Sequence, residues 1–93
     1  MRTLSDCRFE LDALDTMLVE LYLKRLKISE EIGRIKAASG AEIYDKARED
    51  DIIARRTEGL DETKAAAVEA LYRTVFDVSR RIQSGISEGG KDK

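Results

Sequence analysis

The sequence lacks several residue types that common enzyme sites need. Its 93 residues include no histidine and no proline, and a single cysteine, Cys7. Without histidine, the chain has neither a multi-ligand Cys/His metal site nor a histidine-dependent catalytic triad. One cysteine makes no internal disulfide, which fits a reducing compartment, so we expect a cytoplasmic protein. Its chemistry must therefore use Arg, Lys, Asp, Glu, Ser and Gln.

Charge and hydropathy exclude two further classes of partner. The chain has 17 basic and 19 acidic residues, a formal net charge of -2, and so lacks the basic excess that a general nucleic-acid binder needs. No run of about 18 apolar residues is present, so no membrane span is expected. The first residues show no charged flank followed by an apolar stretch, and we expect no signal peptide.

The absence of proline, with six glycines and an even mixture of 42% hydrophobic and 39% charged residues, predicts an all-α fold. The apolar spacing predicts three helices. The first runs from about Thr3 to Ser39, the second from near Asp45 to just before Gly59, and the third begins after a capping Asp61. We expect one domain over residues 1–84, followed by a disordered Gly- and charge-rich tail over residues 85–93.

The first predicted helix is too long for the chain to cover. Its apolar residues repeat with alternating three- and four-residue spacing, as in a coiled coil: Leu4, Cys7, Leu11, Leu14, Leu18, Leu21, Ile28, Ile32 and Ile35. A helix of this length spans about 54 Å, whereas a compact chain of this size has a radius of gyration of about 12 Å. Dimerisation is the simplest way to bury such a seam.

One charged residue interrupts this seam. Arg25 lies between Leu21 and Ile28, where the spacing calls for an apolar side chain. A buried guanidinium is unfavourable by several kcal/mol unless an anion meets it. That anion is either a carboxylate of the protein or a bound ligand.

The other two helices also place polar residues on apolar faces. Asp45, Arg48 and Glu49 share a helix face with Ile52, an arrangement that also fits an ordinary solvated face. On the third helix, a stripe that begins with Tyr72 and Phe76 ends with two neutral hydrogen-bonding residues, Ser79 and Gln83. Arg8 and Lys36 lie next to seam residues, where they are either interfacial or exposed. Together these residues hold more positive than negative charge, which fits a small dianion bearing hydroxyl groups.

These residues make the sequence resemble the all-α chorismate mutases, whose subunits are three helices intertwined as a homodimer. The resemblance covers about Asp6 to Ser84. It rests on five stretches, none specific alone, that occur in the family order: Arg8–Asp15, Lys24-Arg25, Gly33–Lys36, Asp45–Glu49 and Ser79–Gln83.

The resemblance implies a role for each candidate residue and no metal or cofactor. Arg25 and Arg48 would bind the carboxylates of chorismate, together with Arg8 from the other subunit. Lys36 would donate to the ether oxygen and to a carboxylate, and Gln83 would donate to the ether oxygen from the opposite side. Asp45 and Glu49 would bind the ring hydroxyl or order its neighbours, and Ser79 would support a carboxylate. The expected activity is the rearrangement of chorismate to prephenate in aromatic amino acid biosynthesis, downstream of the shikimate pathway.

Two other functions remain open at this point. On the same fold, the chain could be an isochorismate-pyruvate lyase or a 4-amino-4-deoxychorismate mutase, because those enzymes would share the carboxylate-binding residues. A different class is a non-catalytic helical dimerisation module, in which buried charges only set the register of the helices.

Overall fold

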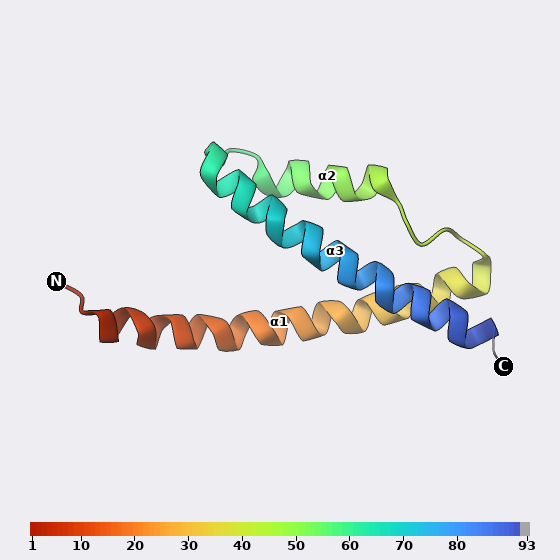
Figure 1. Ribbon diagram of the computed structural model, residues 1–93, viewed down its shortest axis with the longest axis horizontal. Coiled ribbons are helices and arrows are strands. Elements are labelled where there is room, and N and C mark those ends of the chain that lie inside the picture. The colour runs from red at the N-terminus through yellow and green to blue at the C-terminus, as the bar shows by residue number, and fades with distance from the viewer. Residues whose placement is uncertain (92–93) are drawn as a thin grey trace.

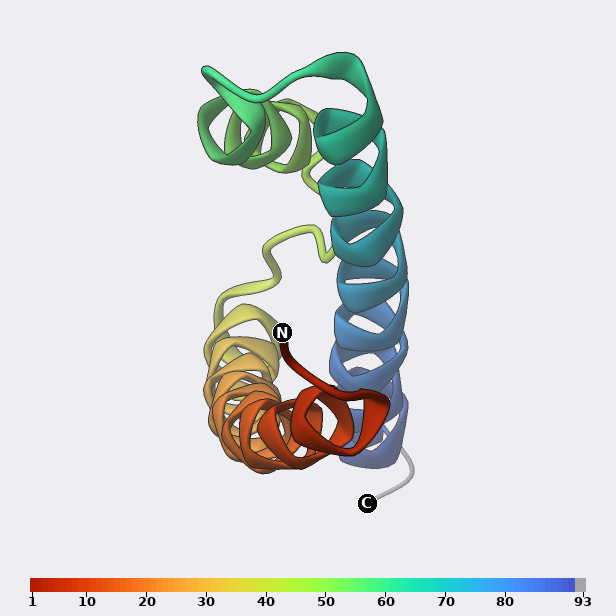
Figure 2. The same ribbon diagram turned by 90° about the vertical axis from the view of Figure 1, so that its left-hand side faces the viewer.

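The computed structural model describes the backbone of residues 1–91 and the side chains of residues 1–86. It consists of three helices, α1 (Leu4–Ser39), α2 (Lys46–Thr57) and α3 (Glu62–Lys91). α3 packs against both other helices, whereas α1 and α2 do not pack against each other (Figures 1 and 2). The all-α prediction of three helices is confirmed. None of the described helices is long and apolar enough to cross a bilayer.

Local capping chemistry sets where the helices begin and end. The Thr3 hydroxyl accepts from the Asp6 backbone N–H, and the Asp6 carboxylate accepts from the Thr3 backbone N–H, which closes a capping box. These hydrogen bonds lower the pKa of Asp6. α1 ends at Gly40, which adopts the left-handed conformation (φ 72°) that glycine tolerates. The carboxylates of Asp45 and Asp61 accept backbone N–H groups at the starts of α2 and α3, which confirms the predicted cap at Asp61 and the predicted start near Asp45.

The end of α3 differs from the prediction. We expected a disordered tail from Gly85, but the helix continues to Lys91. Glycine destabilises a helix by roughly 0.5–1 kcal/mol relative to alanine, but unlike proline it keeps its backbone N–H. A helix can therefore continue through glycines where no proline follows. Residues 92–93, the rest of the predicted tail, lie outside the described residues. The domain boundary at residue 84 stays a prediction.

The N-terminal half of α1 projects away from the other two helices (Figure 1). The chain extends over 59 × 27 × 13 Å with a radius of gyration of 17.1 Å, well above the roughly 12 Å of a compact chain of this length. Among the described residues the buried apolar core is Ile53, Val75 and Phe76. The predicted seam is solvent-exposed in the single chain, with Leu4 at 65% and Leu21 at 62%. An exposed apolar surface of this size is typical of an interaction site.

α1 packs against α3 through a face of small residues rather than through the predicted seam. Ser29 and Gly33 are buried there, while the seam residues Ile28 and Ile35 stay exposed. A Cβ atom added at Gly33 would lie 3.1 Å from the Cα of Gln83. The absence of a side chain at Gly33 thus lets the two backbones approach closely.

We expect Gly33→Val to destabilise the fold by about 1–3 kcal/mol, because its side chain would overpack against the α3 backbone. Thermal unfolding measures the effect, and Gln83 should be displaced with it, because the added side chain lies against its Cα. Gly85→Ala is the matched control: its Cβ meets nothing within 4 Å. Equal stability of Gly33→Val and the original chain would show that the helices do not meet at this glycine.

Candidate active site

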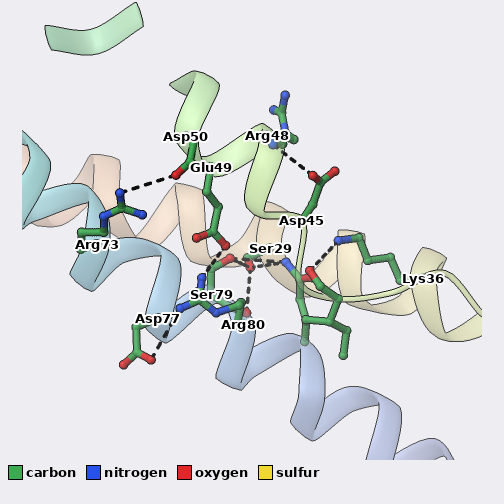
Figure 3. Close-up of polar contacts among 12 residues, drawn as sticks. Ser29, Lys36, Asp45, Arg48, Glu49, Asp50, Arg73, Asp77, Ser79 and Arg80 are labelled. Atoms are coloured by element: carbon green, nitrogen blue, oxygen red, sulfur yellow. Dashed lines mark hydrogen bonds and ion pairs between the residues drawn. The ribbon is translucent and has the colours of Figure 1, made fainter. Parts of the chain in front are cut away.

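A cavity of about 230 Å³ lies where all three helices and the loop between α1 and α2 come together. Its lining is mostly charged and polar, with an apolar minority, and Figure 3 shows many of the polar members. Arg25, Ile32 and Lys36 come from α1, Ile43 and Asp45 from the loop, Arg48, Glu49 and Ile52 from α2, and Phe76, Ser79, Arg80 and Gln83 from α3.

The cavity brings together seven of the eight residues that the sequence singled out. These are Arg25, Lys36, Asp45, Arg48, Glu49, Ser79 and Gln83. The eighth, Arg8, is exposed and does not line the cavity. It precedes Arg25 by seventeen residues of continuous helix, about 25 Å along the axis. Arg8 therefore does not reach the cavity of its own chain.

The charges that line the cavity do not cancel. Four cations and two carboxylates leave a net charge of +2. The Lys36 ammonium donates to the neutral main-chain carbonyl of Ile43 at 3.0 Å (Figure 3), and the Arg25 guanidinium lies over the Phe76 ring, 5.8 Å from its centroid. Among the described residues, no carboxylate lies within 4.0 Å of the side-chain nitrogens of Arg25, Lys36 or Arg48. This excess positive charge is available to an anionic ligand.

The two carboxylates of the cavity are held by the protein. Asp45 accepts the backbone N–H of Arg48 at 3.0 Å, which starts α2 with Arg48 and Glu49 in its first turn. Glu49, with a side chain only 12% exposed, forms an ion pair with Arg80 from α3. This pairing raises the pKa of Arg80, so the guanidinium stays charged at any working pH.

The described residues include no cluster of three or more His, Cys, Asp or Glu side chains that could hold a metal.

Arg80 is a cavity residue that the sequence reasoning missed. It binds Glu49, and its guanidinium lies over the ring of Tyr44 at 4.8 Å from the centroid. Arg80 lies four residues after Phe76 and therefore on the same face of α3. This position was the sequence feature that could have identified Arg80 as a site residue.

Ser29 is a second missed residue. It is 2% exposed, and its hydroxyl meets both Ser79 and Gln83. Ser29 follows Arg25 by four residues and lies on the same face of α1. This spacing was the sequence feature that could have identified Ser29. Ser29 stands behind the cavity, which it does not line.

Comparison with known proteins identifies the family. The family model described as "Chorismate mutase type II" matches residues 7–84, most of the chain. The chain belongs to the type II chorismate mutase family. Its resemblance to the all-α chorismate mutases is thereby confirmed.

Two curated relatives also match this type II chorismate mutase family member. The T-protein of Haemophilus influenzae is 41% identical over 59 residues, which are 62% of this chain and 16% of that protein. The T-protein of Enterobacter agglomerans is 32% identical over 90 residues, 95% of this chain and 23% of that protein. The chain thus spans less than a quarter of the length of these relatives. No solved structure matches the chain significantly.

Proposed function

We propose that this chain is a chorismate mutase that works as a cytoplasmic homodimer and converts chorismate to prephenate for the biosynthesis of aromatic amino acids. The observation that carries the proposal is the cavity with a net charge of +2, in which three cations have no carboxylate partner among the described residues. Chorismate carries two carboxylates and matches that charge. The single cysteine can form no disulfide within the chain, which fits the cytoplasm.

Substrate binding is assigned to the arginines. Arg25 and Arg48 would each hold a carboxylate through paired N–H groups, since a guanidinium matches the geometry of a carboxylate. Ser79 would lie beside one of these carboxylates, with its hydroxyl hydrogen-bonded to Ser29. Asp45 and Glu49 would accept from the ring hydroxyl, and Arg80 keeps Glu49 in place for this role. Two fixed carboxylates hold the substrate in the folded, chair-like conformer that reacts.

The reaction requires no proton transfer and no covalent intermediate. It is a 3,3-sigmatropic rearrangement in which the ether C–O bond breaks while a C–C bond forms. Negative charge grows on the ether oxygen as its bond stretches. Lys36 and Gln83 would donate to this oxygen from opposite sides and bind the transition state more tightly than the ground state. This chemistry suits a chain without histidine.

The homodimer is supported by two features of the single chain. The seam of α1 leaves large apolar side chains such as Leu14, Leu18 and Leu21 more than half exposed. Arg8 lies on the same projecting half of α1, about 25 Å from Arg25 along the helix. Pairing two α1 helices would bury the seam, and we propose that it also carries Arg8 into the cavity of the partner subunit.

The pH dependence follows from the residue types in the cavity. A glutamine amide donates at any pH, whereas a carboxyl at the same place must be protonated to donate. Because Arg80 has a raised pKa and stays charged, the group that holds Glu49 does not titrate in the working range either. We expect a kcat that is nearly constant from about pH 5 to about pH 8, measured by absorbance with chorismate. A steep fall in that range would argue against Gln83 as a donor to the ether oxygen.

The decisive experiment follows the absorbance of chorismate without added metal or cofactor, with a size measurement by light scattering. Isochorismate and 4-amino-4-deoxychorismate are tested in parallel. Fast loss of chorismate to prephenate supports the proposal. Preferred release of pyruvate from isochorismate would identify a lyase, and preferred turnover of the amino compound would identify the related mutase. A folded dimer inactive on all three would favour a dimerisation module.

A further inference from the structure

Ser29 is the most buried polar residue of the described core, and it connects two residues of the cavity. Its side chain comes from α1 and meets α3 fifty residues later in the sequence. The Ser29 hydroxyl forms a hydrogen bond with the Ser79 hydroxyl, and the Gln83 amide nitrogen Nε2 lies 3.1 Å from Ser29 Oγ. Although it does not line the cavity, Ser29 thus contacts two side chains that do.

The amide of Gln83 is only partly satisfied. Gln83 is 6% exposed, and its oxygen Oε1 has no hydrogen-bond partner among the described residues. Its nitrogen faces the serine pair, 3.1 Å from Ser29 Oγ and 3.4 Å from Ser79 Oγ. A buried polar atom without a partner is unfavourable. The two ends of a primary amide have nearly the same shape, so a half-turn about the last side-chain bond exchanges them at little steric cost.

Both arrangements of this amide are compatible with Ser29, because a hydroxyl can donate as well as accept. They differ in what is left for a ligand. When Nε2 faces the serines, the amide oxygen of Gln83 is the atom left to face the ligand. This oxygen repels an ether oxygen that gains negative charge. With Oε1 on the serines, the orphaned oxygen obtains a donor and both N–H groups are free. Only the second arrangement stabilises the reaction.

We propose that Ser29 is a positioning residue for Gln83: its hydroxyl donates to Gln83 Oε1 and turns the N–H end of the amide toward the ether oxygen of the substrate. The inference rests on the proposed mutase function. In the resulting chain the Ser79 hydroxyl donates to Ser29 Oγ, the Ser29 hydroxyl donates to Gln83 Oε1, and Gln83 donates to the substrate. Each hydroxyl donates once, and such a chain strengthens its terminal donor.

A double-mutant cycle tests this role. Ser29→Ala should lower kcat about three- to tenfold, the value of one net hydrogen bond, with little change in KM. In a Gln83→Ala background the same substitution should have no further effect, because Ser29 acts through Gln83. Thr74→Ala is the control: among the described residues, this hydroxyl bonds only to the Ala70 carbonyl of its own helix. If Ser29→Ala lowers kcat equally in both backgrounds, or not at all, the inference is wrong.

The pH profile of Gln83→Glu gives an independent readout. A carboxyl at this position donates only when protonated, so activity should fall as pH rises through its pKa. A donating Ser29 hydroxyl stabilises the carboxylate and lowers that pKa. Adding Ser29→Ala should therefore move the fall in activity to higher pH, and an unchanged or opposite shift would contradict the inference.

Two outcomes separate this inference from the function on which it rests. An unsubstituted chain without mutase activity overturns both. An active chain whose Ser29→Ala variant is folded and keeps its full kcat overturns the role of Ser29 alone. If Ser29→Ala does not fold, Ser29→Cys fills similar space with a weaker donor. It should show an intermediate kcat, and full activity in that variant would count against the role.

Discussion

Replacing Lys36 by methionine is expected to lower kcat about 10²–10³-fold, the usual effect of removing one donor from a developing oxyanion. The reason lies in the electrostatics of the cavity. The Lys36 ammonium is half-buried, bonds to a neutral carbonyl and has no carboxylate within 4.0 Å among the described residues. Its charge is therefore available to an anionic group, which we propose is the ether oxygen of chorismate. Methionine keeps the length and apolar stem of the side chain but removes the charge and all three N–H donors.

Steady-state kinetics with chorismate measures this effect, with unfolding temperature as the check on folding. Lys27→Met is the matched control, since Lys27 is exposed on the same helix and does not line the cavity. Its kcat should be unchanged. A loss carried by KM alone in Lys36→Met would assign Lys36 to ground-state binding of a carboxylate instead. A folded variant with unchanged kcat and KM would remove Lys36 from the site.

The sequence predicted the helices well because their signals are local. The capping residues Thr3, Asp45 and Asp61, and the glycine at position 40, each act within one helical turn. Apolar spacing then predicts the helices between them. The end of α3 had no comparably strong signal, since glycine weakens a helix without removing a hydrogen-bond donor, and there the prediction was wrong.

The cavity was predicted from polar residues that interrupt apolar faces, and this signal has a clear limit. It identified Arg25 because a charge in an apolar seam is conspicuous. It missed Ser29, since a serine is small and common in helices, and Arg80, whose importance comes from its pairing with Glu49 thirty-one residues earlier. Contacts between helices depend on how the helices cross. The seam spacing alone did not reveal that α1 meets α3 through Ser29 and Gly33.

Mixing two inactive variants is expected to restore activity if Arg8 works across the dimer. In the proposed homodimer each cavity takes Arg25 from one subunit and Arg8 from the other. Arg8→Ala and Arg25→Leu homodimers then have two defective sites each. A heterodimer of these chains has one intact site, because its unsubstituted Arg25 and unsubstituted Arg8 meet in the same cavity. When equal amounts of the two chains pair at random, about half of the dimers are mixed, and each mixed dimer has one intact site of two. The mixture should therefore restore about one quarter of the original activity.

The experiment refolds the two variants together from denaturant and compares their rate with the average of the separately refolded proteins. Arg25→Leu mixed with Lys36→Met is the control, since both residues line the cavity of their own chain and no mixed dimer then has an intact site. Arg25→Leu should itself fold, because leucine continues the apolar seam and removes one of four cations from the cavity. No restoration with the Arg8→Ala mixture would exclude a shared site. A monomeric chain with full activity would do the same, because α1 keeps its own Arg8 about 25 Å from Arg25 along the helix axis.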